Sequence, residues 1–452
     1  MTQSGFPTTA RRASVGLATI PPGLLPRDCG RVVVRDGRRT VVGVQPDALV
    51  VADGPAALER LGTLEPGWWA GYISYDIGRA VEHVTPRPGA VPGSAVPGSA
   101  GPGSAGPGSA VPDLVLGRFD ARLVIDPGVI DPGVIDPGVI DPGVIDPDGT
   151  STTPSPTVTV EGTGPGRAAL EEMAGSLRTE APSADTAHAP PRPLLSGVPT
   201  TSLEREDFEN AVRQILEWER AGECYQVNLT RRLTWPVAPD PADLLTALTQ
   251  GNPAPHGALV DLAGIGVVSA SPESFLQWDD GIVQTRPIKG TSHDRAVLAT
   301  SAKDHAENVM IVDLARNDLG RVCEPGTIHV PDLCALEAHP GLFHLVSTVR
   351  GRLADGAGLR DLLTATLPPA SVTGAPKPRV LQAIEDLEPV RRGVYCGAVG
   401  WIDTANDRGD LNVAIRTFTV HRGMRTAGRP ISASGRASSP TATPPPSGTR
   451  PN

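Results

Sequence analysis

The second half of the chain carries hydrophobic periodicities that switch repeatedly between strand and helix spacing. Apolar residues three and four apart predict helices over 202–223, with Ser202 as the N-cap, and over 301–322. Residues 361–389 indicate a helix, a loop rich in proline and glycine, and a second helix. Runs typical of strands occupy 225–235, 258–278, 281–292, 395–403 and 410–420. Because helices and strands follow no strict alternation, the pattern predicts an α+β fold.

The first half of the chain is less regular, and two low-complexity tracts interrupt it. Residues 67–78 alternate like a half-buried strand, and residues 113–126 indicate part of a hairpin. Five-residue units that contain proline recur through 91–110 and through 124–147. Such spacing excludes regular helices and central strands, so we expect both tracts to be extended surface loops.

These patterns predict a division of the chain into successive regions. Residues 1–150 are expected to form an N-terminal region that contains both insertions. Residues 151–200 are rich in Pro, Ser, Thr and Ala and indicate a linker. Residues 201–420 are expected to form the main globular domain, which carries the candidate catalytic residues considered below, and the Arg-, Ser- and Pro-rich residues 421–452 a disordered tail.

Composition narrows the classes of partner. The formal net charge of -10 argues against nucleic acid or an anionic membrane as a partner. No run approaches the roughly 18 to 20 apolar residues that span a bilayer, and no signal peptide is indicated. The 5 cysteines are scattered and match neither a disulfide framework nor zinc spacing. We therefore expect a reduced, cytoplasmic protein.

Several polar residues in the second half of the chain are candidates for chemistry. Asp304 and Glu307 share one face of a predicted helix, either as Mg²⁺ ligands or as acidic residues that complement the helix dipole. Ser371 lies in a turn before a helix, where backbone amides can hold a carboxylate. His344 and Arg416 each interrupt an apolar strand, either as satisfied core groups or as binding groups.

Blocks of sequence in the second half, taken together and in order, resemble the chorismate-utilising enzymes. This family includes anthranilate synthase component I, aminodeoxychorismate synthase component I, and the isochorismate and salicylate synthases. The matching blocks are CYQVNLTRR, SPESFL, PIKGT, DHAENVMIVDLARND, HLVSTVRG, SVTGAPKPRV, YCGAVGWI and NVAIRTF. The resemblance implies the family's fold, in which β-sandwich-like sheets are flanked by helices.

The resemblance also implies roles for single residues. Glu273 matches the acid that protonates the hydroxyl leaving from C4 of the substrate ring. His344 matches a histidine near the ring, and Tyr395 and Arg416 match the pair that binds the enolpyruvyl carboxylate.

Further matches concern the ring carboxylate and the metal. Ser371 and Gly374 match the loop that contacts the ring carboxylate. Glu307 matches a carboxylate that bridges Mg²⁺ to the substrate, and Asp304 is the second candidate ligand on that helix.

Two positions separate the branches of the family. Gln226 replaces the water-activating lysine of isochorismate and salicylate synthases, which argues against water as the nucleophile. Lys289 stands where anthranilate synthases usually have alanine. In aminodeoxychorismate synthases this lysine attacks C2 of chorismate as the C4 hydroxyl leaves. Ammonia then attacks C4 and expels the lysine, giving 4-amino-4-deoxychorismate for 4-aminobenzoate and folate synthesis.

The resemblance leaves the source of ammonia and two alternative functions open. No glutaminase-type cysteine motif is present, so ammonia is expected from a glutamine amidotransferase subunit or from solution. Residues 421–452 contain no Asp or Glu, whereas the family places a second metal glutamate beyond the last matching block. Anthranilate synthase component I and an inactive paralogue that lacks this carboxylate therefore remain alternatives.

Overall fold

The computed structural model describes most of the chain in segments. They are residues 20, 24–27, 29–36, 39–86, 111–126, 157–179, 194–195, 197–236, 239–251, 254–339, 341–421 and 431–436. The repeats over 91–110 and nearly all of those over 124–147 lie outside these residues. The first three residues of the second tract, Val124–Asp126, instead belong to a strand.

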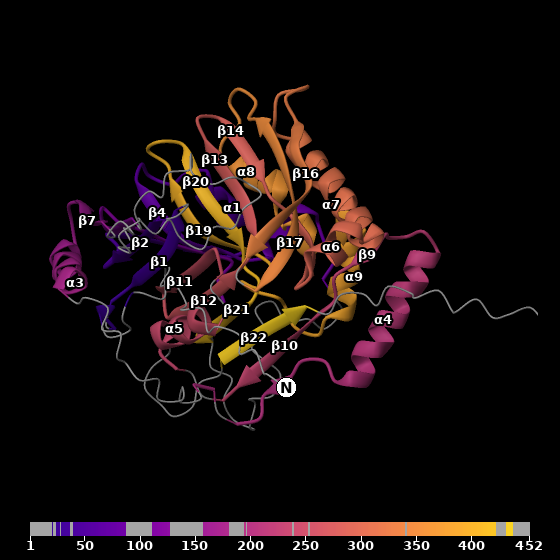
Figure 1. The fold of residues 1–452 in the computed structure, drawn as a ribbon, viewed down its shortest axis with the longest axis horizontal. Coiled ribbons are helices and arrows are strands. Elements are labelled where there is room, and N and C mark those ends of the chain that lie inside the picture. The colour runs from indigo at the N-terminus through magenta and orange to yellow at the C-terminus, as the bar shows by residue number, and fades with distance from the viewer. Residues whose placement is uncertain are drawn as a thin grey trace, which may run out of the picture.

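The described residues form two large antiparallel sheets (Figure 1). In order across the first sheet, the strands are β7 (Thr157–Gly162), β6 (Ala121–Asp126), β2 (Arg39–Val44), β1 (Arg31–Asp36), β11 (His256–Leu262), β12 (Ile265–Ser271), β21 (Thr417–His421), β22 (Ile431–Arg436), β10 (Thr230–Trp235) and β8 (Thr200–Thr201).

The second sheet carries two of the candidate site residues, Lys289 on β15 and His344 on β17. Its order is β15 (Ile288–Ser292), β17 (Leu342–Arg352), β14 (Ile282–Thr285), β13 (Ser274–Asp279), β20 (Arg408–Val413), β19 (Ala398–Asp403), β4 (Trp68–Ile73), β5 (Leu114–Arg118) and β3 (Ala48–Ala52), with β16 (His329–His339) paired to β17. A small separate sheet joins β9 (Gln226–Val227) to β18 (Gly374–Ala375).

Several of the described helices pack on the outer faces of the two sheets. They are α1 (Pro55–Leu61), α2 (Ile77–Val81), α3 (Arg167–Thr179), α4 (Arg205–Arg220), α5 (Pro241–Gly251), α6 (Arg295–Thr300), α7 (Ala302–Gly320), α8 (Leu359–Thr366) and α9 (Lys377–Leu387), with the 3₁₀ turn Ala370–Val372 between the last two. Figure 1 shows α6, α7 and α9 together on one side and α3 and α5 beside the first sheet.

The buried side chains explain this layering. Val32 and Val34 of β1 pack between the sheets with Trp401 of β19, whereas Val33 points to the opposite face and packs with α3 and α5 residues. Because successive side chains of a strand point to opposite faces, β1 contributes apolar residues to the layer between the sheets and to the layer under the helices. The predicted α+β sandwich flanked by helices is confirmed.

Several local predictions are wrong, and burial explains the first of them. The strand β4 is buried at every position, not half-buried, because one face meets the other sheet and the other face meets helices. The predicted hairpin over 113–126 does not form, because β5 and β6 belong to different sheets.

The predicted regions of the chain do not correspond to separate structural units. The segment interpreted as a linker contributes β7 and α3, whose Leu170 and Met173 are buried under the first sheet. The strand β1 pairs with β11, and β4 pairs with β19, so the first and second halves of the chain share both sheets.

The tail and the cap of α4 also differ from the sequence predictions. Ile431–Arg436 form β22, which pairs with both β21 and β10, so this part of the tail is ordered sheet. Ser202 does not cap α4; its hydroxyl accepts a hydrogen bond from the backbone of Arg232 at 2.8 Å, and the N-cap is Glu204.

Two further sequence predictions can be compared with the described residues. All five cysteines are free, as their scattered spacing indicates. Within the described part of the chain, no helix combines the length and the apolar character that crossing a membrane requires.

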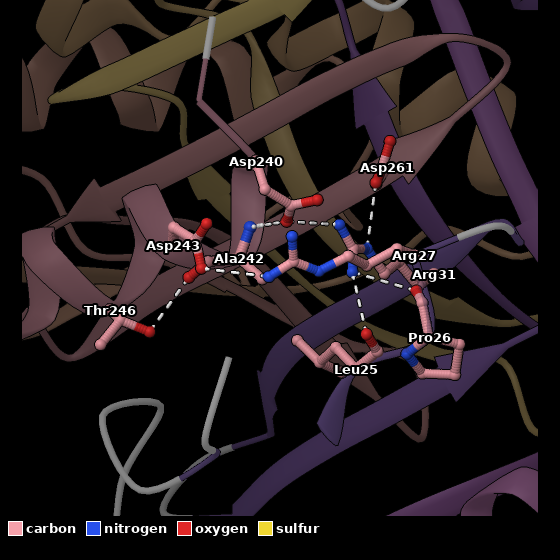
Figure 2. Close-up of polar contacts among 9 residues, drawn as sticks. All are labelled: Leu25, Pro26, Arg27, Arg31, Asp240, Ala242, Asp243, Thr246 and Asp261. Carbon is pink, nitrogen blue, oxygen red and sulfur yellow. Dashed lines mark hydrogen bonds and ion pairs between the residues drawn. The ribbon is translucent and has the colours of Figure 1, made fainter. Parts of the chain in front are cut away.

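A buried arginine holds the first sheet to its covering helix (Figure 2). Arg31 is 0% exposed, and its guanidinium donates to Asp261 at 3.0 Å and to Asp240 at 2.7 Å. It also donates to the carbonyls of Leu25 and Pro26. Because Asp240 accepts from the first turn of α5 as well, this one cation joins β1, β11 and the start of α5.

We expect Arg31→Ala to lower the free energy of unfolding by about 3–5 kcal/mol, because two carboxylates would lose their buried counter-charge. Thermal unfolding followed by circular dichroism measures the change. The control is Arg39→Ala, which removes an exposed pair with Asp126 and should cost less than about 1 kcal/mol. Equal small losses in both variants would contradict the structural role of Arg31.

Candidate active site

Lys289 lies on a strand of the second sheet and not in a turn. It belongs to β15, and the sheet register shifts between Ile288 and Thr291, at the bulge that contains Lys289. The side chain is 5% exposed, and its Nζ donates to the carbonyl of Ser371 at 3.0 Å. Gly290, with φ of 85°, follows it; a Cβ there would lie 2.9 Å from the Cβ of Asp304. The bulge therefore brings the backbone of Gly290, next to the lysine, into close contact with α7.

The loop that receives Lys289 begins at the 3₁₀ turn Ala370–Val372 and continues into β18. Gly374 has φ of 132°, and a Cβ there would lie 2.0 Å from the carbonyl oxygen of Gln226. Glycine is therefore required where the loop packs on β9. The side-chain Oε1 of Gln226 is buried and has no hydrogen-bond partner among the described residues.

A buried ion pair fixes the other side of this loop. Arg392 binds both carboxylate oxygens of Glu388, at 3.0 and 2.6 Å, and donates to the carbonyls of Val372 and Asn228. Glu388 in turn accepts from the backbone of Thr230 at 2.9 Å. The charges of Arg392 and Glu388 are thus compensated by each other and by hydrogen bonds to the backbone. These bonds hold the loop against the segment that joins β9 to β10.

Glu273 and Ser371 line the same small cavity, which has a volume of about 20 Å³. Glu273 is 4% exposed and lies between β12 and β13, where its backbone bonds to Ser271 and Val413 fix its position. Asp318 and Thr366 also line the cavity. A space of this size admits a single water molecule.

His344 faces Lys289's strand from β17. Thr291 is its direct cross-strand partner, and the Thr291 hydroxyl lies 2.9 Å from Nδ1 of the imidazole. Burial, together with the neighbouring His339 and the charge of Arg416, lowers the pKa of His344 to about 4. The imidazole is therefore uncharged at neutral pH, with one ring nitrogen as a hydrogen-bond donor and the other as an acceptor.

Arg416 and Tyr395 belong to neighbouring segments. Arg416 is exposed, has φ of 52°, and lies between β20 and β21, where its charge acts on the rings of His339 and His344. Tyr395 is buried in a turn whose next residue, Cys396, donates its backbone N–H to Ala414. The turn with Tyr395 therefore lies beside the segment that carries Arg416.

The two acidic residues of α7 have different surroundings. Asp304 accepts a 2.5 Å hydrogen bond from the hydroxyl of Ser301, the N-cap of the helix. Glu307 is half-buried and lies 3.8 Å from the ammonium of the exposed Lys303. Among the described residues, no group of three His, Cys, Asp or Glu side chains could hold a metal ion. Mg²⁺ commonly takes one or two protein carboxylates and completes its coordination with water and other oxygens, and Glu307 offers one such carboxylate.

Sequence reasoning missed two buried ion pairs next to the candidate site residues. Asp318 and Lys377 form a buried ion pair at 2.7 Å, and Lys377 also donates to the carbonyl of Thr366. Glu388 and Arg392 form the second buried pair. Only the spacing of four between Glu388 and Arg392 was visible in the sequence, and such spacing is also common on solvated helices.

The structure thus brings together most of the candidate residues, though not all to one point. Lys289, Ser371 and Glu273 are joined by a hydrogen bond and a shared cavity. His344 joins them through Thr291, on the strand of Lys289. The remaining candidates lie in neighbouring segments: Gln226 and Gly374 in the small sheet, Tyr395 before β19, Arg416 after β20, and Asp304 and Glu307 on α7.

We expect the ring of His344 to titrate near pH 4 in the folded protein, and a histidine-selective NMR titration measures this. Its folded pKa lies below the unfolded value of about 6.5, so the unfolded chain binds the proton first. The contribution of His344 to stability is therefore fully present above pH 6.5 and is lost as the pH falls towards 4. The control His344→Gln should show a smaller loss of thermal stability over this range. Titration of His344 near 6.5 would contradict the assignment.

Comparison with known proteins shows the family to which the chain belongs. Residues 151–429 match the model of a family described as chorismate binding enzyme. Over 232 residues the chain is 43% identical to aminodeoxychorismate synthase component 1 of Klebsiella aerogenes, covering 49% of this chain and 51% of that protein. Over 224 residues it is 40% identical to an anthranilate synthase component 1 of Haloarcula marismortui, covering 47% and 46%. The matched part thus spans about half the length of these curated relatives.

Solved structures support the fold. Anthranilate synthase component I from Streptococcus pneumoniae superposes with a TM-score of 0.64 at 24% identity, covering 88% of this chain and 86% of that one. MenF, the menaquinone-specific isochorismate synthase of Escherichia coli, gives 0.61 at 13% identity, covering 96% and 87%. At these identities the likeness establishes the shared architecture alone.

Proposed function

Because this chain belongs to the chorismate binding enzyme family, we propose that it converts chorismate and ammonia to 4-amino-4-deoxychorismate, with Lys289 as the nucleophile. The observation that carries the proposal is the placement of this lysine. Its amine is buried, lies on the strand that faces His344, and donates to the loop that contains Ser371. A lysine removed from water in this way has the environment in which amines serve as nucleophiles.

The proposed reaction proceeds in two substitutions. The amine of Lys289 forms a bond to C2 of the ring, the ring double bonds shift, and the C4 hydroxyl leaves. Glu273 supplies the proton, so that the hydroxyl departs as water. Ammonia then bonds to C4, the double bonds shift back, and the C2–nitrogen bond breaks to return the neutral lysine amine. The new C4 ammonium gives one proton back to Glu273, which restores the acid. Glu273 is suited to the acid role because it is buried beside the loop that Lys289 contacts.

The other candidate residues bind and orient the substrate in this proposal. Arg416, exposed beside His344, pairs with the enolpyruvyl carboxylate together with Tyr395. The neutral His344 lies near the ring, and Ser371 and Gly374 contact the ring carboxylate. The buried, unpartnered Oε1 of Gln226 gains a donor from the substrate, which removes the cost of its burial.

We further propose that Mg²⁺ is the cofactor and that Glu307 holds it together with substrate oxygens. When bound, this ion would offset the negative charge of the substrate and orient its ring carboxylate. Asp304 is a weaker candidate because Ser301 already engages its carboxylate.

Ammonia is proposed to come from a glutamine amidotransferase subunit. The names of the similar proteins from Klebsiella aerogenes and Haloarcula marismortui describe them as component 1, which implies at least one further component there. The corresponding complex here would deliver ammonia to C4 without release into solution, and free ammonia at high concentration would replace it.

We expect Lys289→Met to reduce formation of 4-amino-4-deoxychorismate at least about 100-fold, since methionine keeps the length of the side chain and removes the nucleophile. The assay supplies chorismate, Mg²⁺ and ammonia to the full chain. The matched control is Arg316→Ala, an exposed residue of α7, which should leave the rate unchanged. A Lys289→Met protein that retains the parent rate would exclude covalent catalysis by this lysine.

The identity of the product decides between the two amination reactions. We expect 4-aminobenzoate to appear only after aminodeoxychorismate lyase is added to the ammonia-dependent reaction. Fluorescent anthranilate formed without lyase would instead support anthranilate synthase, which the 40% identity to such enzymes keeps as a second candidate. Absence of both products from folded protein would support the inactive paralogue.

A further inference from the structure

We propose that His339 is a positioning residue that fixes the imidazole of His344 in its working orientation. Only the predicted effect on turnover rests on the function proposed above. Its structural part concerns the two rings alone, and it can be tested without substrate.

The strand register places the two histidines on one face of the sheet. Thr291 of β15 and Glu337 of β16 are the direct cross-strand partners of His344, one on each side. His339 lies two residues after Glu337 on the same strand, so its side chain leaves the sheet on the same face. It is therefore a diagonal neighbour of His344, within reach of an aromatic ring.

The two rings are in direct contact. Their centroids lie 4.8 Å apart with an angle of 64° between the planes, which is the edge-to-face arrangement that aromatic rings prefer. On its other side His344 is held through Nδ1 by the hydroxyl of Thr291 at 2.9 Å. One hydrogen bond and one ring contact from opposite strands thus restrict rotation of the imidazole.

The surroundings of His339 favour a packing role over a polar one. Its Nε2 is buried and has no hydrogen-bond partner among the described residues. Burial lowers the pKa of His339, and the charges of Arg286 and Arg416 add to this while Glu337 opposes it. The ring is therefore neutral beside a neutral His344, and no charge repulsion disturbs the contact. A phenylalanine ring should serve the same purpose without an unpaired nitrogen.

The test compares His339→Phe, which keeps the ring, with His339→Ala and His339→Leu, which remove it. The first readout is the ¹H–¹⁵N spectrum of the imidazole of His344 in the free protein. We expect parent-like signals in His339→Phe and broadened or doubled signals in the other two variants, which show that the ring has lost its fixed orientation. The matched control is His329→Ala, an exposed histidine at the start of the same strand, which should change nothing.

The second readout is turnover in the ammonia assay. We expect the variants without a ring to lose about tenfold in kcat with little change in KM, since a misdirected group costs rate more than binding. Unchanged His344 signals in folded His339→Leu would overturn the proposal, as would equal damage from His339→Phe. If no variant or parent protein makes the amino product, the proposed function fails, and the ring spectra still decide the role of His339.

Discussion

The buried pair of Arg392 and Glu388 is the interaction on which the geometry of the site depends. It joins the end of α9, the 3₁₀ turn Ala370–Val372, and the segment from β9 to β10, and the guanidinium also lies 4.4 Å from the centre of the Tyr75 ring. Separating these segments would leave buried charges without a partner, which costs a large free energy. The carbonyl that Lys289 contacts therefore has a fixed position.

A second set of constraints acts from the opposite side of the site. Asn308 of α7 donates to the carbonyl of Leu345, and the hydroxyl of Ser347 donates to Asn308 while it accepts from the backbone of Cys334. These bonds fix α7 against β17 and against the irregular strand β16. The acidic residues of the helix and His344 thereby share one rigid frame, which suits a site that must orient a ring with several charged groups.

Much of the site could be predicted because its chemistry lies in short blocks of sequence. Lys289, His344, Arg416 and Ser371 each stand out as polar groups in apolar or glycine-rich surroundings, and the structure places them on adjoining segments. The supporting pairs Asp318–Lys377 and Glu388–Arg392 could not be identified in this way. A charged residue has the same letter whether it is solvated or buried, and only packing distinguishes the two.

The sequence by itself determined the periodicities, the order of the main helices and strands in the second half of the chain, and the identity of the candidate reactive side chains. Periodicity is local, so it reports which face of an element is apolar and nothing about its partner. Tertiary structure alone decided that β5 and β6 enter different sheets, that Ile431–Arg436 join the first sheet, and that the strand of Lys289 shifts its register against β17 at this residue. These outcomes depend on pairing between segments far apart in the chain, where burial and hydrogen bonding of the whole sheet set the free energy.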